Sequence, residues 1–161
     1  MGSYADDALF MSRNNIEYVE LISDDGKSKV MVIPAWQGRV MTTSAAGDEG
    51  DSYGWINYSF IKKRQIDLQF NPVGGEERFW LGPEGGVFSL YFRQGEKQIY
   101  KNWKVPPVLD IEAFKIQSQS KNCICLTKEG CLTNACGTTF YLNIKRTISL
   151  LDINVLGRSV E

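Results

Sequence analysis

The chain has 161 residues, of which 43% are hydrophobic and 23% charged, and its formal net charge at pH 7 is −1. This length and balance predict one globular domain that is large enough to bury a core. The 18 Lys and Arg residues against 19 Asp and Glu argue against binding nucleic acid through a basic surface. Histidine is absent, which excludes a Ser-His-Asp triad, a Cys-His dyad and any histidine metal ligand within this chain.

The sequence as given predicts neither a signal peptide at its start nor a transmembrane helix. Residues 1–7 have no basic region followed by an apolar one. No apolar run approaches the roughly 18 residues that a membrane span needs. Residues 5–14 are expected to form an N-terminal extension or a short helix, with Asp6 and Asp7 as candidate caps.

Short β-type runs separated by Gly, Asp and Asn dominate the rest of the sequence. Asp25-Gly26 predicts a tight turn, because glycine supplies the positive φ that such a turn needs. The strands expected around and after it are residues 16–22, 29–34, 38–44, 87–92, 113–118, 123–127 and 138–151, while residues 53–60 fit a strand or a short helix. These elements predict an all-β fold, an antiparallel β-sandwich with little helix, as a single domain over residues 1–161.

All four cysteines lie in one short stretch, as Cys123, Cys125, Cys131 and Cys136. Their spacing lacks the paired C-x2-C of structural zinc sites, so no metal is expected. Cys123 and Cys125 are two apart on a predicted strand and should face the same side. The favoured interpretation is that the cysteines are small apolar fillers of a hairpin, and the alternative is a disulfide across it.

Residues 71–86, NPVGGEERFWLGPEGG, contain five glycines and two prolines, which predict a loop with special backbone angles. Three carboxylates, one guanidinium and one indole lie in the same segment. Carboxylates and Arg78 can hydrogen-bond the hydroxyls of a sugar while Trp80 covers the apolar face of its ring. The structural alternatives are an ion pair of Glu76 or Glu77 with Arg78, and burial of Trp80 in the core.

This loop and its flanks resemble a known family. The segments that carry the resemblance are PAWQGRVMTTS at 34–44, GWIN at 54–57, GGEERFWLGPEGG at 74–86, NWKVPP at 102–107 and IKRTISLL at 144–151. They are similar to an uncharacterised family from carbohydrate-degrading bacteria that is related to the galactose mutarotase-like (aldose 1-epimerase-like) supersandwich. The resemblance implies that fold, a sugar-related ligand and a periplasmic or secreted location.

Two departures from the family limit what the resemblance implies. The chain resembles only the N-terminal half of the family, over roughly residues 6–152. A supersandwich cut there would expose strand edges, which motivates the expectation of a homo-oligomer. Gln69 stands near the position where the family tends to have a histidine. Mutarotases generally pair a histidine acid with a glutamate base, so epimerase chemistry is not expected in this chain alone.

Three functions follow from the sequence. The leading hypothesis is a carbohydrate-binding protein without turnover and without a cofactor. Its binding residues would be Arg39, Asn71, Glu76, Arg78, Trp80 and Glu84, with Trp36, Trp55, Trp80 or Trp103 as the stacking face. The alternative is a carbohydrate-active enzyme (an epimerase, lyase or hydrolase relative) with Glu76, Glu77 or Glu84 as the general base and Arg78 stabilising negative charge. The second alternative is a structural or interaction module without a small-molecule site.

Overall fold

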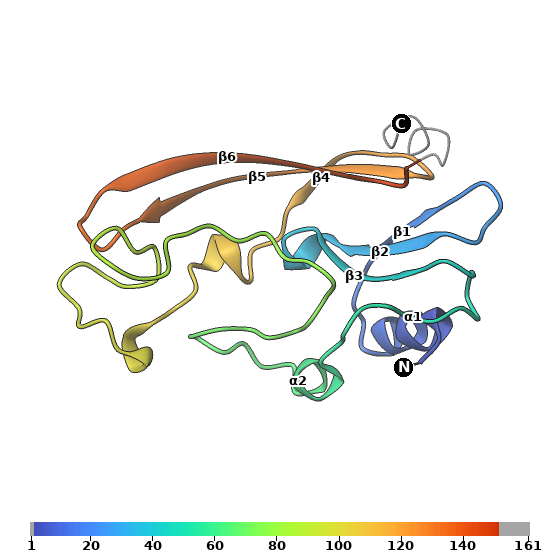
Figure 1. Cartoon of the computed structure of the whole chain (residues 1–161), viewed down its shortest axis with the longest axis horizontal. Helices are drawn as coiled ribbons and strands as arrows, with labels where there is room; N and C mark the ends of the chain where they lie inside the picture. Colours follow the sequence, from blue (N-terminus) through green and yellow to red (C-terminus); the bar gives the residue numbers. More distant parts are fainter. Residues whose placement is uncertain (1, 152–161) are drawn as a thin grey trace, which may run out of the picture.

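The computed structural model describes residues 2–151, which form two three-stranded antiparallel sheets. The first sheet contains β1 (Val19–Ile22), β2 (Lys29–Ile33) and β3 (Arg39–Ser44), and the second contains β4 (Lys115–Gln119), β5 (Cys123–Thr133) and β6 (Thr139–Ser149). The long β5–β6 hairpin passes over the first sheet at one end and over the green and yellow loop segments at the other (Figure 1). The single domain predicted over residues 1–161 also includes residues 1 and 152–161, which lie outside the described residues.

Helices within the described residues are short and few. α1 (Tyr4–Arg13) confirms the helix expected within residues 5–14, but its N-cap is Ser3 rather than an aspartate. Ser3 accepts a hydrogen bond from the Asp6 N–H, and the Asp6 carboxylate accepts one from the Ser3 N–H, which forms a capping box. The remaining helical elements are α2 (Tyr58–Lys62) and the single 3-10 turns η1 (Pro34–Trp36), η2 (Tyr100–Asn102) and η3 (Pro107–Leu109). None of the helices in residues 2–151 is long and apolar enough to cross a membrane.

The sequence predicts the hairpins well and one strand wrongly. The predicted turn forms at Asp25-Gly26, with Gly26 at φ +74°. It lies between β1 and β2, which begin to pair at Ile22 opposite Lys29. The buried strand expected at residues 87–92 is absent, because the backbone there closes local turns instead. The Ser89 N–H donates to the Gly86 carbonyl and the Leu90 N–H to the Pro83 carbonyl. Tyr91 and Phe92 are buried in the core, and Leu90 packs against it.

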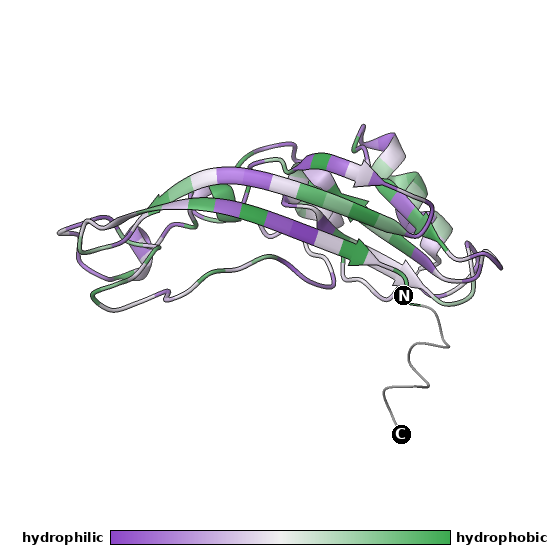
Figure 2. Ribbon diagram, turned by 90° about the horizontal axis from the view of Figure 1, so that it is seen from above, coloured by the Kyte–Doolittle hydropathy of each residue, from purple (hydrophilic) through white to green (hydrophobic). Residues whose placement is uncertain are grey.

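The first sheet is buried on both faces. Val30 and Val32 of β2 point into a cluster shared with Ile124 and Leu126 of the second sheet. Met31 of the same strand points the opposite way, into a second cluster that includes residues of α1 and α2. The first sheet therefore lies between the second sheet and the two helices (Figure 1). From Leu142 to Ser149, partly or fully buried residues of β6 alternate with exposed ones, as its pattern predicts, whereas Phe140 and Tyr141 at its start are both exposed. Figure 2 shows bands of hydrophobic and hydrophilic residues along the long hairpin.

The cysteines do not form the predicted uniform set of fillers. All four are free thiols, so the disulfide alternative is wrong. Cys125 is buried and its thiol donates to Gln117 Oε1 at 3.3 Å. Cys131 and Cys136 are exposed, and the filler interpretation fails for these two because they lie near the outer end of the hairpin.

Close packing between the β5 residue Leu126 and the chain before β3 gives a stability prediction. A Cβ added at Gly38, before β3, would lie 2.3 Å from Leu126 Cδ1 of β5, and Leu126 is 0% exposed. We expect Leu126→Ala to lower the free energy of unfolding by about 2–5 kcal/mol, because it opens a cavity between the sheets. Ile116→Ala, at a residue of β4 that is 39% exposed, is the control and should cost about 1 kcal/mol or less. Urea titrations measure the free energy of unfolding of both variants, and an equal decrease in the two would contradict this packing.

Candidate functional site

Asp110, at the end of η3, binds two of the residues that the sequence marks as sugar ligands. Its Oδ1 accepts from Arg78 Nη2 at 3.0 Å, and its Oδ2 accepts from the Asn71 backbone N–H at 3.0 Å and from Asn71 Nδ2 at 2.7 Å. Arg78 also donates to the Leu109 carbonyl at 2.8 Å. The Asp110 side chain is only 4% exposed. These contacts make Arg78 and Asn71 internal braces of the loop.

Arg39 is also internal. It is 1% exposed, and it donates from Nη1 to the Gly74 carbonyl at 2.8 Å and from Nη2 to Gln37 Oε1 at 3.0 Å. Burial, together with the nearby Arg78 charge, lowers the pKa of Arg39 to about 10, so it remains a cation at neutral pH. Gly75 has φ +112°, and a Cβ there would lie 2.7 Å from Arg39 Cδ. The glycine therefore lets the loop pass directly over the Arg39 side chain.

The three candidate carboxylates have separate partners. Glu76 accepts from Thr43 Oγ1 at 2.9 Å. Glu77 accepts from the Val40 N–H at 3.0 Å and from Arg146 Nη2 at 2.6 Å, and so connects β3 with β6. The predicted ion pair of Glu76 or Glu77 with Arg78 is wrong, because Asp110 takes that position. Glu84 is exposed and accepts from the Trp80 indole N–H at 2.8 Å.

Two of the four tryptophans belong to a row of stacked rings, which we call the aromatic column. It runs through Trp80, Tyr91, Trp103 and Tyr100, with successive ring centroids 5.1, 5.6 and 6.2 Å apart. The Arg78 guanidinium caps one end, 4.4 Å from the Trp80 ring centroid. Tyr100, at the other end, is 78% exposed. The arrangement presents one aromatic ring to solvent on a stack of three others.

Trp36 and Trp55 lie elsewhere. Trp36 packs against the cluster of α1 and α2. It also lines a mainly apolar pocket of about 340 Å³ together with Asn71 and Asp110, but both amide hydrogens of Asn71 are directed to protein oxygens, those of Asp110 and the Asp67 carbonyl. Trp55 is exposed, and its carbonyl accepts from the Gly75 N–H at 2.8 Å. The structure thus brings Trp80 and Trp103 together and leaves the other two tryptophans out of the column.

The exposed end of the column borders a small pocket of about 320 Å³, which we call the Tyr100 pocket. Its lining consists of Glu84, Phe92, Gln98, Ile99, Tyr100 and Trp103. Gln98 holds the pocket wall in place, because its side-chain amide donates to the Gly86 carbonyl and accepts from the Gly86 N–H, both at 2.7 Å. This pocket combines an aromatic face with the carboxylate of Glu84.

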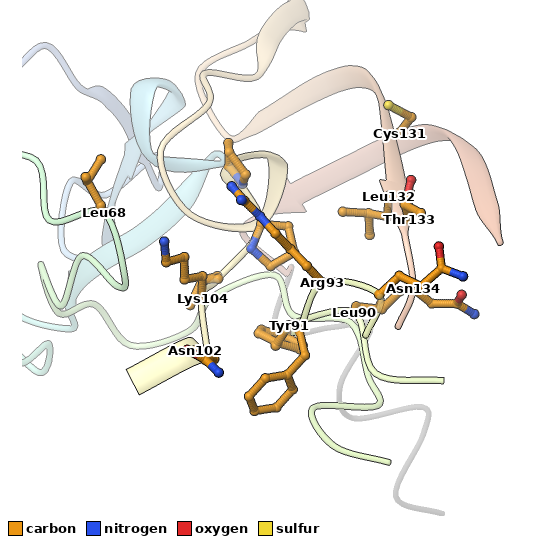
Figure 3. A pocket seen from close by; sticks show the side chains of 15 residues that line it. Leu68, Leu90, Tyr91, Arg93, Asn102, Lys104, Cys131, Leu132, Thr133 and Asn134 are labelled. Carbon is orange, nitrogen blue, oxygen red and sulfur yellow. The ribbon is translucent and has the colours of Figure 1, made fainter. Parts of the chain in front are cut away.

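A larger pocket of about 580 Å³ lies between residues 90–107 and the end of β5. We call it the Arg93 pocket. Figure 3 shows Arg93 and Lys104 on the side of the loops, facing Leu132, Thr133 and Asn134 across the hollow. Tyr91 of the aromatic column forms part of its wall. No group of three or more His, Cys, Asp or Glu in the described part of the chain is arranged to hold a metal ion.

Sequence reasoning missed the residues that shape these pockets. Tyr100 and Arg93 lie outside the segments that carry the family resemblance, and Lys104 lies within one of them, NWKVPP at 102–107, without being marked as a binding residue. A further signal is the number of aromatic and basic residues between positions 91 and 104. Asp110 was missed because its partners Arg78 and Asn71 lie 32 and 39 residues away in the sequence.

Comparison with known proteins identifies the family. The model of DUF6786, a family of unknown function, matches residues 2–161, so the chain belongs to this family. No curated protein and no solved structure matches the chain.

The Asp110 contacts predict a large energetic effect. Asp110→Ala should lower the free energy of unfolding by about 3–5 kcal/mol, because it leaves the largely buried Arg78 cation without its counter-ion. Adding Arg78→Met to that variant should restore part of the loss, since no unpaired charge is then buried. Asp24→Ala is the control: it breaks the exposed pair with Lys121 and should cost less than about 1 kcal/mol. Denaturant unfolding gives the free energy of unfolding of the wild type and of the three variants. A decrease of less than about 1 kcal/mol for Asp110→Ala would contradict the role of Asp110 as a brace.

Proposed function

We propose that this family member binds carbohydrate, without turnover, and that the Tyr100 pocket is the binding site. The observation that carries the proposal is the exposed ring of Tyr100 at the end of the aromatic column, beside the Glu84 carboxylate. An aromatic face covers the C–H side of a sugar ring, while a carboxylate accepts hydrogen bonds from its hydroxyl groups.

The column favours binding because it orders the stacking ring before a ligand arrives. Tyr100 is nearly parallel to Trp103, at 12°, and Trp103 to Tyr91, at 6°. The Tyr91 hydroxyl is in turn fixed by its hydrogen bond to the Leu81 carbonyl at 2.6 Å. A side chain that is already ordered loses less conformational entropy on binding, which improves affinity.

Glu84 supplies polar recognition beside this ring. Its Oε1 accepts from the Trp80 indole, and a carboxylate has about four acceptor positions on its two oxygens. Oε2 can therefore accept from a sugar hydroxyl while the Trp80 contact holds the group in place. The volume of about 320 Å³ lies in the range of roughly 300–1,000 Å³ that small-molecule sites occupy.

A second part of the proposal concerns the fold. We propose that the two sheets form part of a galactose mutarotase-like supersandwich. The support is that both sheets contribute to one apolar cluster, with Val32 and Val40 from the first sheet and Ile124 and Ile144 from the second.

A saccharide screen with a matched pair of variants tests the proposal. Tyr100→Ala should weaken saccharide binding about tenfold or more, because a lost stacking contact of about 1.4 kcal/mol is one decade in affinity. Tyr53→Ala, which removes a 57% exposed tyrosine near β3, should leave affinity unchanged. Isothermal titration measures the affinities. An affinity that Tyr100→Ala does not change would refute the site, and no detectable binding of any saccharide in the screen would refute the function. Saccharide consumption by the wild-type protein would instead establish the enzymatic alternative.

A further inference from the structure

We infer that the carbohydrate is acidic, and that the Arg93 pocket receives its carboxylate or sulfate group while a neighbouring sugar ring stacks on Tyr100. This inference rests on the proposed function and adds the chemical class of the ligand. Four features of the described residues carry it: the charge of the pocket lining, the charge of the surrounding segment, the connection between the two pockets, and the amides around the cations.

The lining of the Arg93 pocket is cationic. Arg93 and Lys104 both line it, and none of its 15 lining residues is an aspartate or glutamate. Neither cation belongs to an ion pair among the described residues. Glu96 is the nearby acid, and it is directed to the Arg93 backbone N–H at 3.4 Å. A guanidinium and an ammonium that both lack a carboxylate partner favour an anionic ligand.

The segment that forms this pocket is basic although the whole chain is slightly acidic. Residues 93–104 contain Arg93, Lys97, Lys101 and Lys104 against the single acid Glu96, in a chain with a net charge of −1. Positive charge concentrated around a pocket raises the local concentration of anions and increases the rate at which they bind.

The two pockets adjoin each other. Phe92 lines both of them. Around η2, Tyr100 and Trp103 line the Tyr100 pocket, whereas Asn102 and Lys104 line the Arg93 pocket. One ligand of two or more sugar rings can therefore lie on the aromatic face and place a charged substituent between the cations.

Ordered amides accompany the cations. Asn134 is 3% exposed, and its Oδ1 accepts from the Thr138 N–H at 2.8 Å, so its side chain is held by the turn before β6. Asn102 is held by a hydrogen bond from Nδ2 to the Lys97 carbonyl at 2.9 Å. Side-chain amides both donate to and accept from hydroxyl groups, which suits a sugar that also carries an anionic group.

The experiment is isothermal titration of the full chain with two sets of oligosaccharides of known composition. One set contains uronic-acid oligosaccharides and their carboxyl-reduced counterparts, and the other contains sulfated oligosaccharides and their desulfated counterparts. We expect at least one acidic member to bind about tenfold tighter than its neutral counterpart, as charge-assisted hydrogen bonds require. The two sets also show whether the anion is a carboxylate or a sulfate.

Two double variants locate the effect. Arg93→Ala/Lys104→Ala should abolish the preference for the acidic member and keep the affinity for the neutral one. Lys97→Ala/Lys101→Ala removes two cations of the same segment that do not line the pocket and should keep most of the preference. An equal loss in both variants would overturn the pocket assignment, and so would equally tight binding of a DNA oligonucleotide, because both show general polyanion attraction.

The failure of this inference and that of the proposed function are distinguishable. Neutral and acidic counterparts that bind equally, with both weakened by Tyr100→Ala, would overturn the acidic ligand and leave the proposed function standing. An acidic preference that depends on Arg93 and Lys104 but not on Tyr100 would support the Arg93 pocket and overturn the stacking site. Binding of no saccharide at all would overturn both.

Discussion

The ion pair between Arg78 and Asp110 is the contact on which the arrangement of the loops depends. Asp110 binds Asn71 at the start of the glycine-rich loop and Arg78 in its middle, so one buried carboxylate fixes two points of that loop. The guanidinium then lies against Trp80, which packs on Tyr91. The position of the whole aromatic column, including its exposed end, follows from this chain of contacts.

The same physics explains why the two arginines among the predicted ligand residues, Arg39 and Arg78, are directed into the protein. A charged side chain that is removed from water needs a counter-ion or several hydrogen bonds, otherwise the desolvation cost destabilises the fold. Arg39 and Arg78 meet most of this requirement with protein groups, namely Gly74 and Gln37 for Arg39 and Asp110 for Arg78, although the buried Nε of each arginine has no partner. Groups that are already satisfied inside the protein are poor ligands for a sugar, and recognition passes to residues beside them that remain accessible.

The sequence predicts elements whose cause is local and misses those whose cause is distant. The Asp25-Gly26 turn and the alternation of β6 depend on neighbouring residues, and both are correct. The apolar run at residues 87–92 resembles a strand, but the turns that close on Gly86 and Pro83 prevent pairing. For the site, the polar residues of the loop form hydrogen bonds with the protein's own groups, such as Arg78 with Asp110 and Glu76 with Thr43. Whether Arg78 meets a ligand or Asp110, and whether Tyr100 is buried or exposed, depends on tertiary contacts that no local pattern encodes.

The most direct test of the account is to observe the four tryptophan indole N–H groups by NMR while a binding saccharide is added. All four were candidates for the stacking face, and the structure separates them into two inside the aromatic column and two outside it. The account predicts a saturable shift of the Trp103 indole, which lines the Tyr100 pocket, with Trp36 and Trp55 unchanged. A shift of Trp36 or Trp55 without one of Trp103 would contradict it.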